Sequence, residues 1–505
     1  MCAKSARPRA AGATTVPKSP PVPPEARFAQ RIRLGVLTSE ITPEIVQEAL
    51  ERTGRVELRR RVLPARATVY FVLALCLFGS AESAGAPGYR VVLRNLSNKL
   101  RHVPELAFQR LPTSSALTRA RQRLGDKPLQ VLFERLAGPL ATPALASAYA
   151  FGLRLVAWDG TALDVPDTPA NAAQFGFTGK NGVNQCGNPQ VRLMALIECG
   201  THAVIDAAFD AVAGFSEHAL ARRLLASLEP TMLLLADRNF AGYELWGATR
   251  ATGAHLVWRL KKHVIFDPVK VLPDGSFLTI MRTPADNVRY GQARAAGRVL
   301  KEPPHGHLIR VVDYTVTIRR AGGPPQIETF RLATSLLDYK QAPAHQLAKI
   351  YHERWEIENS YAEIKNRLRG AGFVLRSKLP ELVYQEIYAL LTVYQALCSL
   401  ELHTAERAGI DAERVSFTVT VNLARLSITD QVADNPTTLA SAHRHFAADL
   451  LDALLPPRRD RRCERVKKPA KNTFETKKRE RPRTDDKISY DLKVVRRPPL
   501  PAITP

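Results

Sequence analysis

The fold is decided by a stretch of ten residues, TMLLLADRNF at 231–240. Residues 232–236 are apolar without a break, a pattern typical of a strand that is covered on both faces of its sheet. Asp237 follows directly, and ligand sites in α/β sheets commonly lie at the ends of such strands. The stretch therefore predicts a buried strand that carries a carboxylate to one edge of a sheet.

The neighbouring segments alternate between strand-like and helix-like patterns. Apolar, strand-like runs occupy 153–158, 191–198, 203–212 and 255–260, and helix-like runs occupy 216–228 and 243–252. Such alternation predicts an α/β core in which helices flank a mixed sheet.

The rest of the chain divides by composition. Residues 262–332 hold many Pro and Gly, short β-type runs and no strong helix, whereas 342–368 and 381–402 are strongly helical. The predicted domains are a disordered basic N-terminus (1–30), a helical N-terminal domain (31–145), an α/β core in two parts (150–261 and 333–402), a β-rich insertion (262–332), a C-terminal helical region (403–455) and a disordered basic tail (456–505).

The chain is strongly basic. Its 505 residues include 72 Lys and Arg against 48 Asp and Glu, a formal net charge of +24, which favours a polyanionic partner such as nucleic acid. The six cysteines form no C-x-x-C pair, so no zinc site is expected and reduced thiols indicate a cytoplasmic protein. The longest apolar run, Val69–Phe78, is shorter than the roughly 20 residues of a membrane span, and no membrane partner is expected.

The segment Leu111–Gly125 is predicted to form a short capped helix that ends at the glycine. Arg119 and Arg123 lie one turn apart on this helix and share a face. Two interpretations stay open, a helical unit that contacts DNA phosphates and a basic face that meets only solvent.

The helical segment 342–368 carries two adjacent stripes. At about 100° per residue, an apolar stripe contains Ile350, Ile357, Ile364 and Leu368, and a polar stripe beside it contains Tyr351, Arg354, Glu358 and Lys365. A surface helix normally scatters its charges on the far side, so the polar stripe is predicted to lie at the rim of the packed face. The alternative is a salt-bridged helix, in which Arg354 and Glu358 stabilise only their own helix.

Three acids form the candidate catalytic set. Asp159 and Asp237 each end a strand-like run, and Glu358 lies on the polar stripe. Divalent cations prefer oxygen ligands, and two ions roughly 3.5–4 Å apart can activate a water or a 3′-hydroxyl and stabilise the leaving oxygen. Either aspartate alone is as well explained by a turn, and other acids compete: Asp164, Asp167, Asp206 and Asp210.

These residues resemble those of DDE transposases of the insertion-sequence-four family. The segment Tyr351-x2-Arg354-x3-Glu358-x6-Lys365 matches the family's Y-R-E-K signature at full spacing. WDGT at 158–161 and DRNF at 237–240 match its two aspartate motifs, with Asn239 where Gly or Ala is frequent. The β-rich stretch before Glu358 and the helical N-terminal region also match, so that the resemblance covers about residues 30–455.

The resemblance implies a ribonuclease-H-like core and an enzyme that cleaves and transfers DNA at the terminal inverted repeats of its own insertion sequence. Asp159, Asp237 and Glu358 would bind Mg²⁺ or Mn²⁺, as two ions. Contacts to DNA would come from Tyr351, Arg354 and Lys365, with Arg119, Arg123, Lys261 and Lys262 as further candidates, although a solvated loop explains the two lysines equally well. The partners would be double-stranded transposon ends, target DNA and a second copy of the chain, at the nucleoid in the bacterial cytoplasm.

Relatives that form DNA hairpins can use an aromatic side chain of the insertion to take up a flipped base. The insertion here has no Trp. The available substitutes are Phe277, Tyr290 and Tyr314, with Trp258 just before the insertion.

Three alternatives stay open. The first is a ribonuclease-H-like nuclease without strand transfer. The second is a catalytically inactive, transposase-derived DNA-binding protein, against which the intact Asp159, Asp237 and Glu358 argue. The third is an RNA-binding protein that uses its basic tails, for which the chain has no stacking motif of the expected kind.

Overall fold

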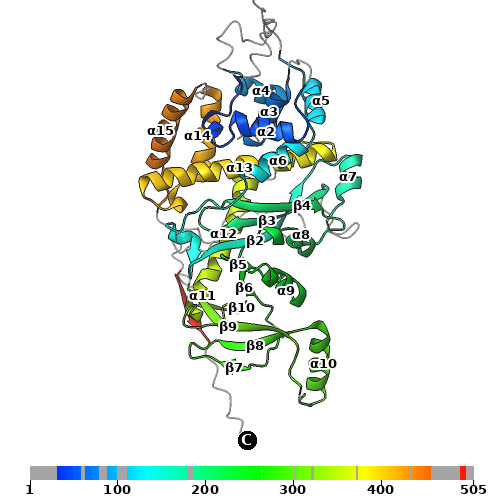
Figure 1. Ribbon diagram of the computed structural model, residues 1–505, viewed down its shortest axis with the longest axis vertical. Helices are drawn as coiled ribbons and strands as arrows, with labels where there is room; N and C mark the ends of the chain where they lie inside the picture. Colours follow the sequence, from blue (N-terminus) through cyan, green and yellow to red (C-terminus); the bar gives the residue numbers. More distant parts are fainter. Residues whose placement is uncertain are drawn as a thin grey trace, which may run out of the picture.

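The computed structural model describes residues 31–57, 63–78, 88–98, 111–178, 187–262, 264–300, 302–319, 324–370, 374–430, 435–456 and 489–495. The predicted basic segment 1–30 and most of the predicted tail at 456–505 lie outside these residues. Helices gather at one end of the molecule and a large sheet extends from its middle to the other end (Figure 1).

The helical end combines the N-terminal helices with three helices from the C-terminal half of the chain. Its members are α2 (Pro43–Arg52), α3 (Ala65–Leu77), α4 (Tyr89–Leu96), α5 (Ser114–Leu124), α6 (Lys127–Leu136), α13 (Pro380–Ala408), α14 (Phe417–Asp430) and α15 (Pro436–Asp452). The long helix α13 packs against α3 and α6, so the N-terminal helices rest on the C-terminal part of the chain. Side chains cap the starts of α2 and α5, since Thr42 accepts from Ile45 N and Thr113 accepts from Ala116 N, and the cap of α5 was predicted.

The core sheet has a ribonuclease-H-like order. Its strands, from one edge inward, are β4 (Val204–Ala211), β3 (Gln190–Glu198), β2 (Leu153–Asp164), β5 (Met232–Ala236) and β6 (His255–Arg259). Strands β2, β3 and β4 pair in antiparallel fashion, whereas β5 is parallel to both β2 and β6. The predicted fold class is confirmed, with β1 (Tyr149–Ala150) and α7 (Pro169–Phe175) as small additions beside β2 and β4.

Strand β5 is buried along its whole length, as the apolar run predicts. Leu233 and Leu235 join a core cluster that also contains residues of α12 (Trp355–Ala362) and α13. Leu234 and Ala236 face the opposite cluster, beneath α8 (Glu217–Arg223) and α9 (Tyr243–Ala251). A strand with helices on both faces needs apolar side chains at every position.

The insertion continues the core sheet. It contains β7 (Lys270–Val271), β8 (Phe277–Arg282), α10 (Pro284–Ala295), β9 (Gly306–Arg319) and β10 (Gln326–Thr334), and β10 pairs with β6. The expectation of no strong helix in the insertion was wrong. Helix α10 buries only Asp286 and Ala293, so it has no apolar stripe that a periodicity argument would detect, and Thr283 caps its start.

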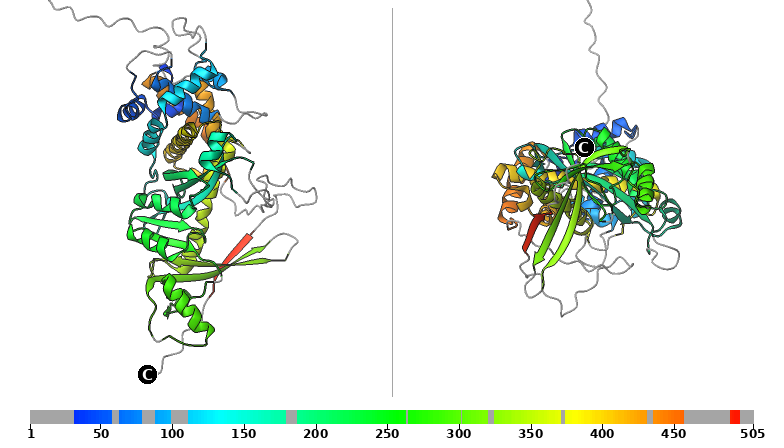
Figure 2. Two further views of the ribbon diagram at one scale, coloured as in Figure 1. Left: turned by 90° about the vertical axis from the view of Figure 1, so that its right-hand side faces the viewer. Right: turned by 90° about the horizontal axis from the view of Figure 1, so that it is seen from below.

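Part of the predicted disordered tail is a strand. Residues Ser489–Val494 form β11, which pairs with β9 from Tyr314 to Arg319 (Figure 2). Strand β8 pairs with the other half of the same edge of β9, so β11 extends the sheet alongside residues that β8 leaves unpaired. The prediction of disorder therefore fails for these six residues.

No helix among the described residues is both long and apolar enough to cross a membrane.

Candidate active site

The register of the sheet places Asp159 and Asp237 side by side. The parallel pairing of β2 with β5 ends at Ala157 and Leu235, and each aspartate lies two residues further along its chain. Ala157 and Leu235 belong to the core cluster on the α12 side, and side chains two residues apart on a strand share a face. Asp159 therefore lies on the α12 side at the open end of the parallel strands, and Asp237, directly after β5, is close enough for its charge to act on Asp159.

The sequence suggested that Asp159 ends its strand, but this prediction was wrong. Strand β2 continues to Asp164, and Asp159 pairs with Ala195 of β3. The second half of β2 is mostly half-buried, which is why the apolar run stops before the strand does. Asp237 does follow the last residue of β5 and accepts a hydrogen bond from Asn239 N at 2.6 Å, which fixes the turn after the strand.

The segment that carries Glu358 is helical but is not one regular helix. It consists of α11 (Ala344–Tyr351), a 3₁₀ turn (His352–Arg354), α12, and a π-helix (Glu363–Leu368). A constant 100° step does not hold across such breaks, so the predicted stripes are correct only locally. The apolar positions Ile357, Ile364 and Leu368 are nevertheless fully buried, whereas Ile350 is partly buried.

Arg354 joins two members of the predicted triad. Its Nη1 atom lies 3.7 Å from Asp159 Oδ2, and its Nη2 atom donates to Glu358 Oε1 at 3.2 Å. Only 14% of the Arg354 side chain is exposed, against 25% for Asp159 and 29% for Glu358. The guanidinium group thus lies between the two carboxylates in a partly closed site.

Burial raises the pKa of Asp159 to about 6. A hydrogen bond from Gly160 N and the charge of Arg354 oppose this rise, whereas the charges of Asp237 and Glu217 add to it. The three predicted acids and Arg354 therefore share one electrostatic environment, in which the pKa of Arg354 is raised although its burial alone would lower it.

Glu217, at the start of α8, was missed by the sequence analysis. Its carboxylate approaches Gly160 so closely that a Cβ atom at this glycine would lie 2.8 Å from Glu217 Oε1. The glycine of the WDGT motif therefore gives room for a fourth acid, from the opposite face of the sheet.

The other two residues of the predicted polar stripe are engaged with the protein. Lys365 donates to Thr161 Oγ1 at 3.0 Å and to the carbonyl oxygen of Ala162 at 2.8 Å, so it holds the π-helix against β2. Tyr351 is only 4% exposed, and its ring lies 5.9 Å from the guanidinium carbon of Arg354.

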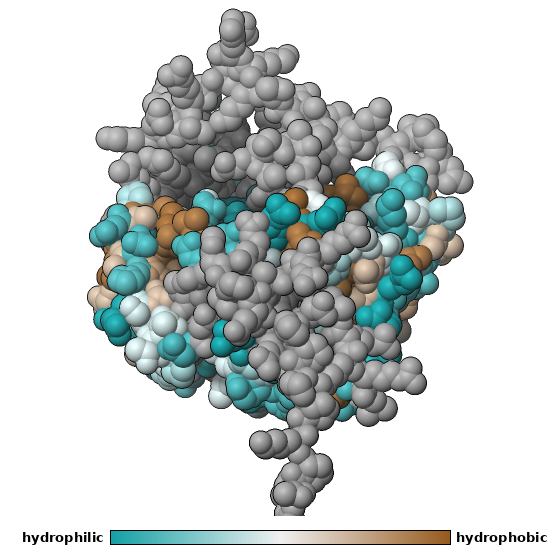
Figure 3. Space-filling model, turned by 90° about the horizontal axis from the view of Figure 1, so that it is seen from above, coloured by the Kyte–Doolittle hydropathy of each residue, from teal (hydrophilic) through white to brown (hydrophobic). Residues whose placement is uncertain are grey.

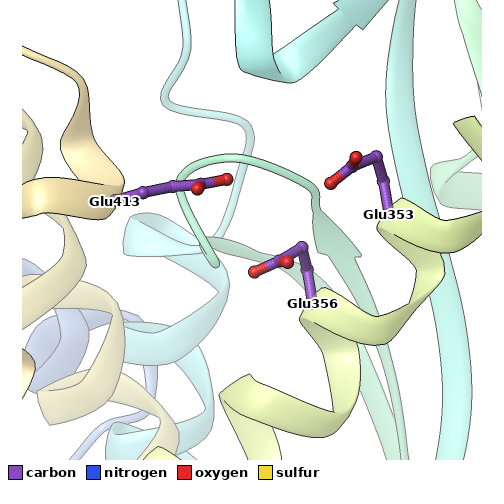
Figure 4. A group of neighbouring side chains, drawn as sticks. All are labelled: Glu353, Glu356 and Glu413. Atoms are coloured by element: carbon purple, nitrogen blue, oxygen red, sulfur yellow. The ribbon is translucent and has the colours of Figure 1, made fainter. Parts of the chain in front are cut away.

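A second acidic group lies behind α12. The carboxylates of Glu353, Glu356 and Glu413 point toward one another, with ligand atoms within 4.8 Å (Figure 4). Among the described residues, no other group of three such side chains has its ligand atoms this close together. The predicted triad is wider, because the guanidinium of Arg354 stands between its members.

His202 occupies the rear of the same helix. Its Nε2 atom lies 2.6 Å from Glu356 Oε2 and its Nδ1 atom lies 3.0 Å from Glu363 Oε2, while Tyr394 donates to Glu363 at 2.9 Å. Burial alone would lower the pKa of His202, but the charges and hydrogen bonds of Glu363 and Glu356 together raise it well above its usual value. His202 therefore belongs to a buried ionic network that holds the junction of α12 and the π-helix.

The remaining candidates from the sequence lie apart from the triad or in the core. Arg119, Arg123, Lys261 and Lys262 are exposed, and the described surface at the helical end is largely hydrophilic with small separate apolar patches (Figure 3). Asp164, Asp206 and Asp210 are bound by Gln190, Ser227 and Arg223, and Asp167 is exposed. Trp258, Phe277 and Tyr314 are buried in the core, and Tyr290 is half-buried on α10 beside Arg282.

Comparison with known proteins gives consistent matches along the chain. Residues 31–134 match the family described as insertion element 4 transposase N-terminal, and residues 150–395 match the transposase DDE domain. The chain is 29% identical over 431 residues to the transposase InsG for insertion sequence element IS4 of Escherichia coli strain K12, covering 85% of this chain and 90% of that protein. A solved piggyBac transposase synaptic complex with hairpin DNA aligns with a TM-score of 0.41 and 11% identity, over 82% of this chain and 84% of that one.

Proposed function

Because the chain belongs to the DDE transposases and is therefore a DNA transposase with an insertion-element-4 N-terminal domain, we propose that it cleaves and transfers strands at the terminal inverted repeats of its own insertion sequence. The catalytic groups are Asp159, Asp237 and Glu358. One observation supports this assignment. Arg354 contacts both Asp159 and Glu358, and Asp237 directly follows the strand that pairs with the strand of Asp159.

A DDE domain implies dependence on divalent metal, and the donor set here suits Mg²⁺ or Mn²⁺. Carboxylate oxygens are the ligands that these hard cations prefer. The position of Arg354 supports the same assignment, since a cationic group already lies between two of the three acids. Two ions held there would activate a water or a 3′-hydroxyl and stabilise the leaving oxygen.

Arg354 has to leave the carboxylates before they can hold a metal ion. Oxygens that share one such ion lie about 2.1 Å from it, and a guanidinium between them excludes it. A phosphate of the DNA end is a suitable second partner, because arginine binds phosphate through two parallel hydrogen bonds. DNA therefore draws Arg354 from Asp159 and Glu358 and opens the site. Tyr351 and Lys365 contact the same DNA strand after they release their present partners within the protein.

The wider DNA contacts are basic and exposed. Arg119 and Arg123 on α5 bind phosphates of the transposon end, and Lys261 and Lys262 after β6 bind the flanking or target strand. Two copies of the chain act on paired ends, at the nucleoid in the bacterial cytoplasm.

Alanine substitutions at the triad test the proposal. Asp159→Ala, Asp237→Ala and Glu358→Ala are expected to abolish cleavage of end DNA in Mg²⁺ while end binding, measured by mobility shift, stays close to wild type. Full cleavage by any one of these variants would remove the mechanism. Transfer of pre-cut ends into a plasmid distinguishes a transposase from a nuclease, which would cleave DNA without joining it.

A further inference from the structure

Tyr361 lies one helical turn after Glu358, and its side chain reaches the backbone of the core sheet at Asp159. Its hydroxyl donates to the carbonyl oxygen of Asp159 at 2.5 Å and accepts a hydrogen bond from Ala195 N at 3.1 Å. Asp159 and Ala195 are partners across β2 and β3. One phenol thus links the helix that carries Glu358 to the backbone of Asp159.

The phenol is fixed in this role by its surroundings. Tyr361 is 7% exposed and belongs to the main core cluster. A tyrosine hydroxyl keeps its proton at neutral pH, so this group remains a donor to Asp159. The backbone groups on either side are also constrained, since Gly160 N donates to Asp159 Oδ1 at 2.8 Å and thereby orients the carboxylate.

We propose that Tyr361 is a positioning residue that sets the spacing between Asp159 and Glu358 for metal binding. The inference rests on the function proposed above. Lys365 makes a parallel link four residues later, to Thr161 and Ala162, but only the Tyr361 link reaches a residue of the triad. A carboxylate on a helix and a carboxylate on a strand can share an ion only if helix and strand keep a fixed distance. Groups that orient metal ligands in this way typically change metal affinity or activity by about 10–100-fold when they are removed.

The test is Tyr361→Phe, which keeps the ring in the core and removes only the hydroxyl. Mn²⁺ binding is measured by electron paramagnetic resonance on the full chain with bound end DNA. We expect the dissociation constant for Mn²⁺ to rise about tenfold, and single-turnover cleavage to recover when Mn²⁺ is raised to saturation. Because bound metal also stabilises a weakened fold, a thermal melt of each variant without metal monitors folding, and a melt equal to wild type assigns the defect to metal binding.

Tyr394→Phe is the matched control. It also removes a buried phenol that bonds to this helical segment, through Glu363 at 2.9 Å, but it has no link to β2. We expect Mn²⁺ affinity close to wild type. Equal losses in the two variants would show general loosening of the helix and would overturn the inference.

Asp159→Ala and Glu358→Ala separate the inference from the proposed function. If both abolish Mn²⁺ binding and Tyr361→Phe leaves it unchanged, the metal site stands and the role of Tyr361 is wrong. If neither alanine variant changes Mn²⁺ binding, the proposed metal site itself is wrong, and the inference falls with it.

Discussion

The two sides of α12 carry glutamates in opposite environments. Glu358 faces the triad, is 29% exposed, and contacts the guanidinium of Arg354. Glu356, two residues earlier, is 3% exposed and contacts the ring of His202. On the front the partner is a long, flexible side chain, whereas on the rear it is a short ring held between Glu356 and Glu363. The difference separates the carboxylate that we propose is catalytic from one that bonds within the fold.

The largest expected effect comes from exchanging each glutamate for glutamine. Glu358→Gln should reduce cleavage below detection and change the free energy of unfolding by less than about 1 kcal/mol. Glu356→Gln should retain cleavage but lower that free energy by about 1–3 kcal/mol, because a buried hydrogen bond to a charged partner is weakened. Cleavage assays and urea unfolding of both variants test the contrast. A Glu356→Gln variant that is inactive but as stable as wild type would contradict this contrast between the two glutamates.

Arg354→Gln should raise the affinity of the DNA-free protein for Mn²⁺ on the order of tenfold, because a unit positive charge no longer lies beside the ion. With end DNA bound, the difference from wild type should shrink, since Arg354 has then moved to a phosphate. Calorimetric titration of both proteins with and without DNA measures the coupling. Arg354→Lys is the control that keeps the charge but cannot span both carboxylates, and an identical DNA effect in all three proteins would contradict the exchange.

The His202 network predicts a pH dependence of stability. The pKa of His202 is higher in the folded chain than in the unfolded one, so the folded state binds the extra proton. Its stabilising effect is complete below pH 6.5, the unfolded value, and is lost as the pH rises through the folded value. The melting temperature of the wild type should therefore fall above pH 6.5. His202→Gln should melt lower at pH 6 and show a flatter profile, and a profile as steep as that of wild type would count against the network.

The smallest effects on function are expected for substitutions on α5, where buried and exposed arginines differ in the same way as the two glutamates of α12. Arg121 is fully buried and donates to Gln385, Ser377 and Leu382, whereas Arg119 and Arg123 are exposed. Arg119→Gln or Arg123→Gln should weaken end binding and lower the salt slope of the binding constant by about 1, the value for one phosphate contact. Binding measured from low to high salt tests this, and an unchanged slope would indicate that the exposed pair meets only solvent.

The sequence alone predicted those parts of the site that depend on local order. The apolar run before Asp237 predicted a strand buried on both faces, and the ion pair between Arg354 and Glu358, which was the alternative interpretation of the polar stripe, is also present. Strand β2 was predicted too short, because its second half is only half-buried and lacks the continuous apolar pattern.

The features that the sequence did not reveal arise from contacts between distant segments. His202 and Glu356 are 154 residues apart in the chain, and Tyr361 meets Asp159 across 202 residues. The 3₁₀ turn and the π-helix also escape a fixed helical period. The sequence does contain a signal for Tyr361, since an aromatic residue three positions after Glu358 lies on the same side of a helix.

The pairing of β6 with β10 has a consequence for how the enzyme can vary. The chain leaves the core sheet at Arg259 and returns to it at Leu332, which is the partner of Arg259 across the two strands. The exit and the re-entry are thus neighbours at one boundary of the catalytic sheet, and the part of the insertion that bonds to the start of α11, through Asp274 and Arg310, is what ties its content to the helical segment of Glu358. This boundary is a natural place to graft a new DNA-contacting module onto the same chemistry.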